Sequence, residues 1–130
     1  MKQAFVAAIA ILTAGLLGPS AATAHHGLVK LYDDSKRVTV NGVIEDVAWI
    51  NPHIYLKVVS VENGQQKIYR VESVPIAFAR RAGITKAKLL GDGRPAQVTF
   101  MPSRTDPLLG WSMAIKYADG RNISFSGFNE

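Results

Sequence analysis

Three histidines, His25, His26 and His53, are the side chains of this sequence best suited to bind a metal ion. The chain contains no cysteine, so no thiolate can act as a ligand or as a nucleophile. A chain that began at His25 would carry a free α-amine, with an unperturbed pKa of about 7.7 to 8, beside an imidazole near 6.5. Both nitrogens could then give up protons to a metal ion near neutral pH.

The α-amine and the Nδ1 atom of a terminal His25 would chelate one ion. A third nitrogen would complete the planar donor set that Cu(II) favours, and His53 is the candidate to supply it. His26 is the rival third donor because it is adjacent to His25 in the chain. Copper is therefore the cofactor that these residues favour, and the arrangement resembles the histidine brace of copper proteins that begin with histidine.

Two purely structural interpretations of these histidines stay open. The first residues of a mature chain are usually mobile, so His25-His26 could be a tolerated start without a function. His53 follows Asn51-Pro52 and could secure that turn through a hydrogen bond, since histidine has structural uses besides metal binding.

The first 24 residues have the pattern of a secretory signal peptide. Lys2 gives a positive start, Ala4 to Leu17 is almost wholly apolar, and Ala22 and Ala24 are the small residues expected at a cleavage site. The apolar run is shorter than the roughly 20 residues that span a bilayer as a helix. We therefore expect cleavage after Ala24, a periplasmic or secreted protein and no stable membrane span afterwards; an uncleaved anchor is the alternative.

The charge pattern argues against nucleic acid as a partner. Fifteen Lys and Arg against ten Asp and Glu give a net charge of +5, but the basic residues are scattered. They lack the dense basic stripe with interleaved aromatic residues that is typical of nucleic-acid binding.

The sequence also lacks a pattern of hydrolytic enzymes, the serine on a glycine elbow. We therefore expect a binding protein rather than an enzyme, with copper redox activity as the open exception.

Short β-rich segments separated by Gly, Asn and Asp turns predict a mainly β (α+β) fold. The predicted strands are Val38–Trp49, His53–Val61, Lys67–Val74, Gln97–Met101, Gly110–Tyr117 and Asn122–Phe125. A short helix is expected between Pro75 and Gly83, with a further turn from Thr85 to Gly91. This order predicts one domain, residues 25–130, with a small five- to six-stranded OB-like Greek-key barrel.

Details of three segments refine the predicted barrel. Gly42 interrupts the first strand, as residues do where a strand bends or bulges. Glu62-Asn63-Gly64 predicts a hairpin between the second and third strands. In the second strand, Ile54, Leu56 and Val58 should face the core, and His53 and Tyr55 should lie on the opposite face.

Several segments together resemble a bacterial periplasmic family, the domain of unknown function 6152. They are His25-His26-Gly, VTVNGVIEDVAWINPHIYL over Val38 to Leu56, the Arg80-Arg81-Ala-Gly-Ile-Thr segment, and ADGRNISFSG near the end. The most specific piece besides the paired histidines is the Trp-x-Asn-Pro-His segment from Trp49 to His53. The resemblance implies an exported, small OB-like domain and assigns no catalytic residue.

Two other groups of residues predict weaker sites. Trp49, Tyr55 and Tyr69 could form an aromatic surface, and the alternative function is a metal-free module that binds a protein, a glycan or a small anionic ligand there. Trp111, Met113 and Met101 could offer soft groups to Cu(I). For these three, core packing is the favoured interpretation.

Overall fold

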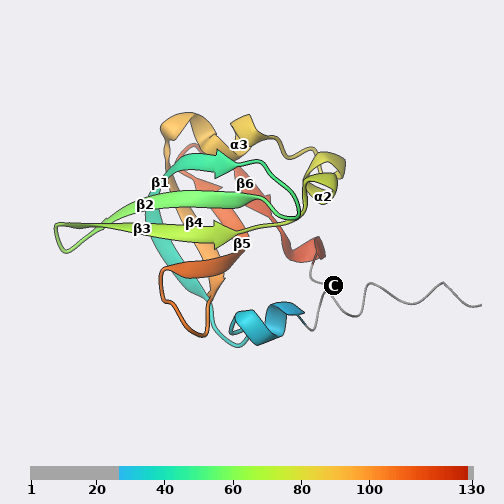
Figure 1. Ribbon diagram of the computed structural model, residues 1–130. Coiled ribbons are helices and arrows are strands. Elements are labelled where there is room, and N and C mark those ends of the chain that lie inside the picture. The colour runs from blue at the N-terminus through green and yellow to red at the C-terminus, as the bar shows by residue number, and fades with distance from the viewer. Residues whose placement is uncertain (1–26, 129–130) are drawn as a thin grey trace, which may run out of the picture.

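Six β-strands and several short helices make up the part of the chain that the computed structural model describes, residues 27–128 (Figure 1). The strands are β1 (Val38–Ala48), β2 (Tyr55–Glu62), β3 (Gln65–Glu72), β4 (Pro95–Pro102), β5 (Leu109–Tyr117) and β6 (Asn122–Ser124). The helices after β3 are α2 (Ile76–Arg81) and α3 (Lys86–Leu90), with the 3-10 turns η1 (Gly91–Gly93) and η2 (Ser126–Phe128). A further helical turn covers residues 27–31.

The sheet closes on itself to form a five-stranded barrel. Its strand order is β3-β2-β1-β4-β5-β6, and a parallel pairing between β3 and β5 joins the two ends, leaving β6 as an added strand beside β5. The helices α2 and α3 lie between β3 and β4 in the chain. The predicted mainly β fold with a small five- to six-stranded barrel is thereby confirmed.

The period-two pattern of β2 explains how this strand contributes to the core. Ile54, Leu56 and Val58 are all buried, whereas His53 and Tyr55 are partly exposed, as predicted. A main cluster of buried residues fills the barrel, and a smaller one of Tyr32, Met101 and Trp111 lies beside the helix at residues 27–31.

The first strand bends close to the predicted glycine. A Cβ atom on Gly42 would lie 2.3 Å from the backbone oxygen of Val59, so glycine is required there by the close approach of two strands. The register shift between β1 and β2 lies slightly later, between Ile44 and Asp46. The predicted irregularity is thus present, but the bulge follows Gly42 instead of coinciding with it.

The hairpin between β2 and β3 has the predicted turn. Asn63 and Gly64 have φ angles of 51° and 76°, the positive values that a two-residue type I′ turn requires. The turn sets the pairing along both strands, which places Glu72 opposite Tyr55.

The helices after β3 also begin and end as the sequence predicts. Arg80 and Arg81 occupy the last turn of α2, the side chain of Thr85 accepts a hydrogen bond from the Lys88 backbone N–H at 3.2 Å, and Gly91 ends α3 in a left-handed conformation. The helical turn at residues 27–31 was not predicted. No helix within residues 27–128 is long and apolar enough to cross a membrane.

Candidate functional site

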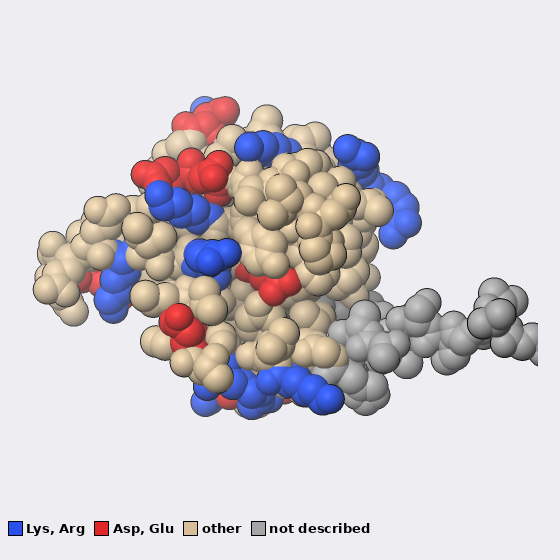
Figure 2. Space-filling model, in the orientation of Figure 1, with Lys and Arg blue, Asp and Glu red and all other residues tan. Residues whose placement is uncertain are grey.

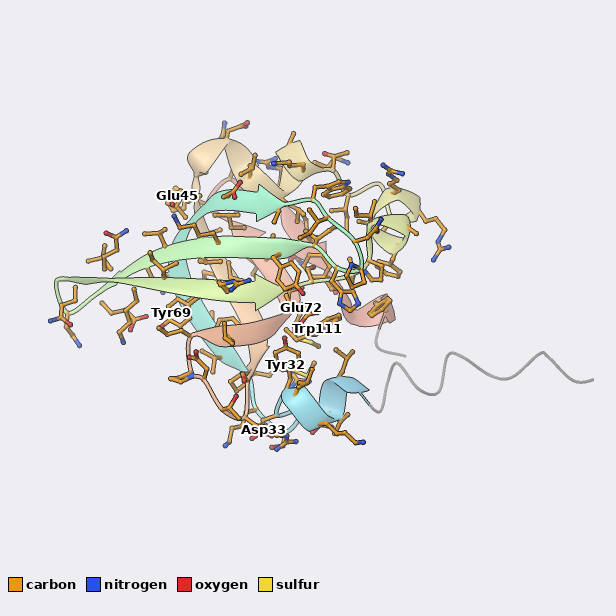
Figure 3. The ribbon with its side chains drawn as sticks, in the orientation of Figure 1. Tyr32, Asp33, Glu45, Tyr69, Glu72 and Trp111 are labelled. Carbon is orange, nitrogen blue, oxygen red and sulfur yellow. The ribbon has the colours of Figure 1, made fainter. Side chains whose placement is uncertain are left out.

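The carboxylate of Glu72 is the centre of a polar cluster at one end of the barrel, and Figure 3 shows it beside Tyr32 and Trp111. His53 Nδ1 lies 2.5 Å from Glu72 Oε1, and the Tyr55 hydroxyl lies 3.4 Å from the same oxygen. The Tyr32 hydroxyl donates a hydrogen bond to Oε2. Side chains from two separate segments, one containing Tyr32 and the other His53 and Tyr55, therefore meet on one carboxylate of β3.

The contact with Glu72 determines how the His53 ring is protonated when it is neutral. An ionised carboxylate can only accept hydrogen bonds, so Nδ1 carries the proton and donates it. The lone pair of the neutral ring is then on Nε2. The His53 side chain is 25% exposed, against 16% for Glu72. His53 is thus an oriented and partly accessible nitrogen donor.

Trp111 forms the apolar side of the cluster. Its indole is fully buried and contacts the His53 ring edge-on, with 5.2 Å between ring centroids. It also stacks on Phe128 at 5.8 Å and contacts Tyr32 at 6.0 Å. The parallel pairing of β3 with β5 places Trp111 beside Glu72. The indole Nε1 is buried and has no hydrogen-bond partner among residues 27–128.

The two tyrosines remain hydrogen-bond donors at neutral pH. Burial, followed by the hydrogen bond and the negative charge of Glu72, raises the pKa of Tyr32 far above its ordinary value. Burial and the charge of Glu72 also raise the pKa of Tyr55. Both hydroxyls therefore keep their protons and can donate hydrogen bonds to the Glu72 carboxylate.

Of the predicted metal ligands, His53 is placed in this cluster, whereas His25 and His26 lie outside the described residues, as do Ala22 and Ala24. Within residues 27–128, no group of three or more His, Cys, Asp and Glu side chains is placed to hold a metal ion. The described residues therefore contribute one oriented histidine to any metal site at this position.

The three aromatic residues predicted as a ligand surface do not lie on one surface. Tyr55 faces the Glu72 cluster, but Tyr69 points into the barrel because it alternates with outward-facing residues of β3, and it is only 6% exposed. Its hydroxyl donates to Glu62 at 2.6 Å. Trp49 packs against the core and lines a separate hollow with Arg80 and Lys86.

The predicted group of sulfur and aromatic side chains is brought together as part of the core. Met101 pairs with Trp111 across β4 and β5, and both are buried. Met101 and Met113 line a hollow of about 200 Å³ together with Leu28 and Tyr32. The positions of Met101 and Trp111 thus agree with core packing, the interpretation favoured for them from the sequence.

Sequence reasoning missed Glu72 and Tyr32. A signal for Glu72 was present, because pairing outward from the Asn63-Gly64 turn places it opposite Tyr55 and next to His53. Tyr32 carries no such signal, since tertiary packing of the helical turn before it sets its position.

Charges near the cluster are mixed. On the face shown in Figure 2, acidic and basic side chains lie beside one another over the upper strands, and several basic side chains gather along the lower edge.

The fold and the cluster define a small closed β-barrel with one carboxylate-bound histidine at its end. A family model described as "Family of unknown function (DUF6152)" matches residues 15–110. Because the match covers most of the chain, the chain belongs to this family. No curated protein and no solved structure matches the chain.

Proposed function

We propose that this chain is an exported copper-binding protein that holds one Cu(II) ion between its mature N-terminus and His53. Removal of residues 1–24 would make His25 the first residue and give it a free α-amine. The amine, the His25 imidazole and the Nε2 atom of His53 would supply three nitrogen donors, which suit Cu(II). His26 is the rival for the third position.

The observation that carries the proposal is the 2.5 Å contact between His53 Nδ1 and Glu72. Histidines that bind metals almost always donate their other ring N–H to a carboxylate, a carbonyl or a water molecule, which fixes the tautomer and the ring orientation. Glu72 gives His53 this partner, and Tyr32 and Tyr55 in turn support Glu72. Nε2 is left as the ligating atom.

The attachment of the first described residues also supports the proposal. Leu28 packs against the cluster that contains Trp111, and Trp111 contacts His53. Tyr32, at the end of the same helical segment, bonds to Glu72. His25 precedes Gly27 by two residues, which can span at most about 7 Å. The chain that follows the proposed terminal ligand is therefore held against the cluster that contains His53.

The test is a calorimetric titration of Cu(II) into the mature protein that begins at His25 and into the same protein extended by one N-terminal alanine. The extension removes the α-amine from His25 and leaves every side chain in place. We expect one Cu(II) per native chain and a large loss of affinity in the extended protein. Equal binding by both proteins, or binding by neither, would overturn the proposal.

Two variants separate the candidate third donors. His53→Gln should weaken Cu(II) binding and remove one nitrogen from the coordination seen by electron paramagnetic resonance. His26→Gln should retain both the affinity and the number of nitrogens. The opposite pattern would assign the third position to His26 and contradict the role of His53.

A further inference from the structure

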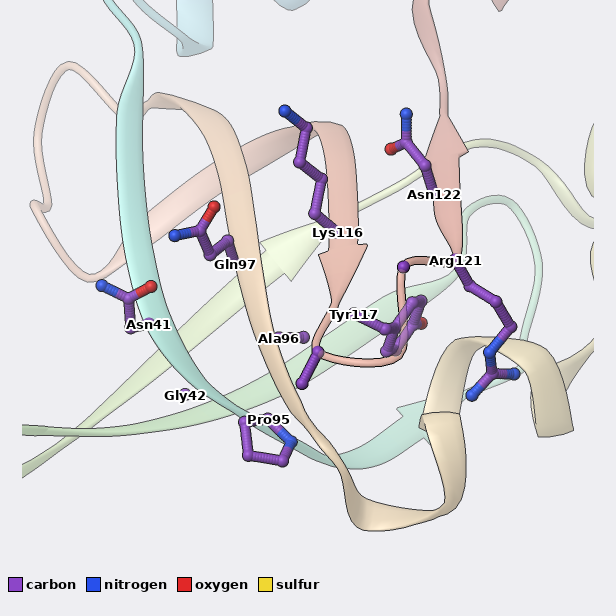
Figure 4. A pocket seen from close by; sticks show the side chains of 11 residues that line it. Asn41, Gly42, Pro95, Ala96, Gln97, Lys116, Tyr117, Arg121 and Asn122 are labelled. Carbon is purple, nitrogen blue, oxygen red and sulfur yellow. The ribbon is translucent and has the colours of Figure 1, made fainter.

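A row of four polar side chains crosses the outer face of β1, β4, β5 and β6 (Figure 4). Asn41 pairs with Gln97, Gln97 with Lys116, and Lys116 with Asn122, so the four residues stand in register on successive strands. All four are exposed. We call Asn41, Gln97, Lys116 and Asn122 the polar row.

The side chains of the polar row form no hydrogen bond or ion pair with one another or with any other residue between 27 and 128. Some other outward-facing groups of the barrel are paired within residues 27–128. Lys57 lies 2.5 Å from Glu45, and the hydroxyls of Thr39 and Thr99 lie 2.9 Å apart in the neighbouring row. The polar row therefore offers three carboxamides and one ammonium group for an external partner.

The polar row lines a hollow of about 600 Å³, and none of the residues that line it is acidic. Small residues, including Gly42 and Ala96, also line the hollow. At one end, the Arg121 guanidinium lies over the Tyr117 ring at 5.1 Å and bonds to Asp119 at 2.8 Å. Asp119 is shared by Arg121 and Arg94, whose Nη1 atom lies 3.0 Å from Asp119 Oδ2. Among the described residues that line the hollow, Lys116 is thus the cation without an ion-pair partner.

We propose that the polar row binds an anionic oligosaccharide, with a uronic acid carboxylate at Lys116 and sugar hydroxyls on the flanking carboxamides. A carboxamide both donates and accepts hydrogen bonds, as a hydroxyl does, whereas an ammonium group suits a carboxylate. Three strand spacings of about 4.8 Å give the row a length of roughly 14 Å, which suits an extended ligand. The row shares no residue with the Glu72 cluster, so the proposal is independent of copper binding.

The test is a titration of the mature protein with a trimer of galacturonic acid, followed by calorimetry and by backbone amide NMR. We expect binding, with shifts concentrated at the four positions of the polar row. The fully methyl-esterified trimer keeps the sugar hydroxyls but lacks the negative charges. It should bind roughly tenfold more weakly. Equal binding of the ester, or shifts located elsewhere, would overturn the proposal.

Matched variants test the charged contact at Lys116 and the hydrogen bonds of the carboxamides, and a second anion tests whether the row selects a glycan. Lys116→Gln should weaken binding of the acidic trimer roughly tenfold. Lys86→Gln changes the net charge equally at a different hollow and should have no effect. Asn41→Ala should weaken binding without changing the net charge. A short polyphosphate that binds as tightly at the same row would show attraction of anions in general and overturn the assignment to a glycan.

Discussion

At the residue scale, one carboxylate organises the candidate metal site. Glu72 accepts hydrogen bonds from Tyr32, which precedes β1, and from His53 and Tyr55, which lie just before and at the start of β2. Without Glu72, the His53 ring would lose the partner that selects Nε2 as its free nitrogen. The side chain that contacts the proposed ion is thus His53, and Glu72 is a positioning residue.

Glu72→Gln tests this positioning role. Glutamine retains the size of glutamate and can still accept a hydrogen bond, but it lacks the charge that favours a proton on Nδ1. We expect Cu(II) affinity to fall by about 10- to 100-fold, as is typical when the outer partner of a metal-ligating histidine is changed. Calorimetric titration measures the affinity, and the copper spectrum should keep the same number of nitrogen donors.

Glu62→Gln is the matched control for this substitution. Glu62 also accepts a hydrogen bond from a tyrosine, Tyr69, but it lies at the other end of the β2–β3 hairpin. We expect its replacement to leave Cu(II) affinity unchanged. If both variants bind copper equally well, Glu72 does not orient a ligand.

At the element scale, close approach of strands in the barrel depends on the missing side chain of Gly42. An added Cβ would meet the backbone of Val59, and a backbone atom cannot turn away as a flexible side chain can. We expect Gly42→Ala to lower the free energy of unfolding by about 1–3 kcal/mol, the usual cost of overpacking. Urea unfolding followed by circular dichroism measures this change.

Gly127→Ala provides the comparison for Gly42→Ala. A Cβ at Gly127 would meet no heavy atom within 4 Å. The free energy of unfolding should therefore stay within about 0.5 kcal/mol of the original value. Equal stability of the two variants would show that β1 can move away from β2 without cost.

The elements of the barrel were largely predictable because local chemistry determines them. The apolar alternation of Ile54, Leu56 and Val58 predicts the buried face of β2, and Asn63-Gly64 predicts the hairpin. In the candidate site, His53 was predicted as a metal ligand, Tyr55 and Trp111 were predicted as members of other groups, and Glu72 could be found by pairing outward from the hairpin turn. Tyr32 reaches Glu72 because tertiary packing of Leu28 positions a short helical segment, and no local pattern encodes that contact.

The inward direction of Tyr69 illustrates a different limit of sequence reasoning. The presence of a tyrosine in a strand does not reveal which face of the sheet its side chain occupies. Whether Tyr69 and Tyr55 share a face depends on how β2 and β3 are paired. The hairpin pairs Tyr69 with the buried Val58 and Tyr55 with the outward Glu72. Counting from the turn would have separated the two tyrosines.

At the scale of the whole molecule, the barrel separates the two proposed sites. Trp111 and Lys116 are five residues apart on β5, a distance of about 17 Å along an extended strand. Trp111 borders the Glu72 cluster, and Lys116 stands in the polar row. One strand can thus serve two binding regions whose ligands do not compete for the same side chains.

The stability of the whole barrel should decline at alkaline pH, and Tyr117 should account for part of the decline. Burial raises the pKa of Tyr117 to about 12, and its hydroxyl donates to the backbone oxygen of Leu89 at 2.7 Å. In the unfolded chain, a tyrosine has its ordinary pKa of about 10. The unfolded state therefore loses this proton first, so the contribution of Tyr117 is complete below about pH 10 and is lost as the pH rises toward about 12.

Tyr117→Phe isolates this contribution because it removes the titrating hydroxyl and keeps the ring over which Arg121 lies. At neutral pH, we expect the variant to be less stable by about 1 kcal/mol, because the hydrogen bond to Leu89 is lost. Between about pH 10 and about pH 12, its stability should fall less steeply than that of the unchanged protein. Urea unfolding at a series of pH values gives both curves, and curves that stay parallel through this range would contradict a buried, protonated Tyr117.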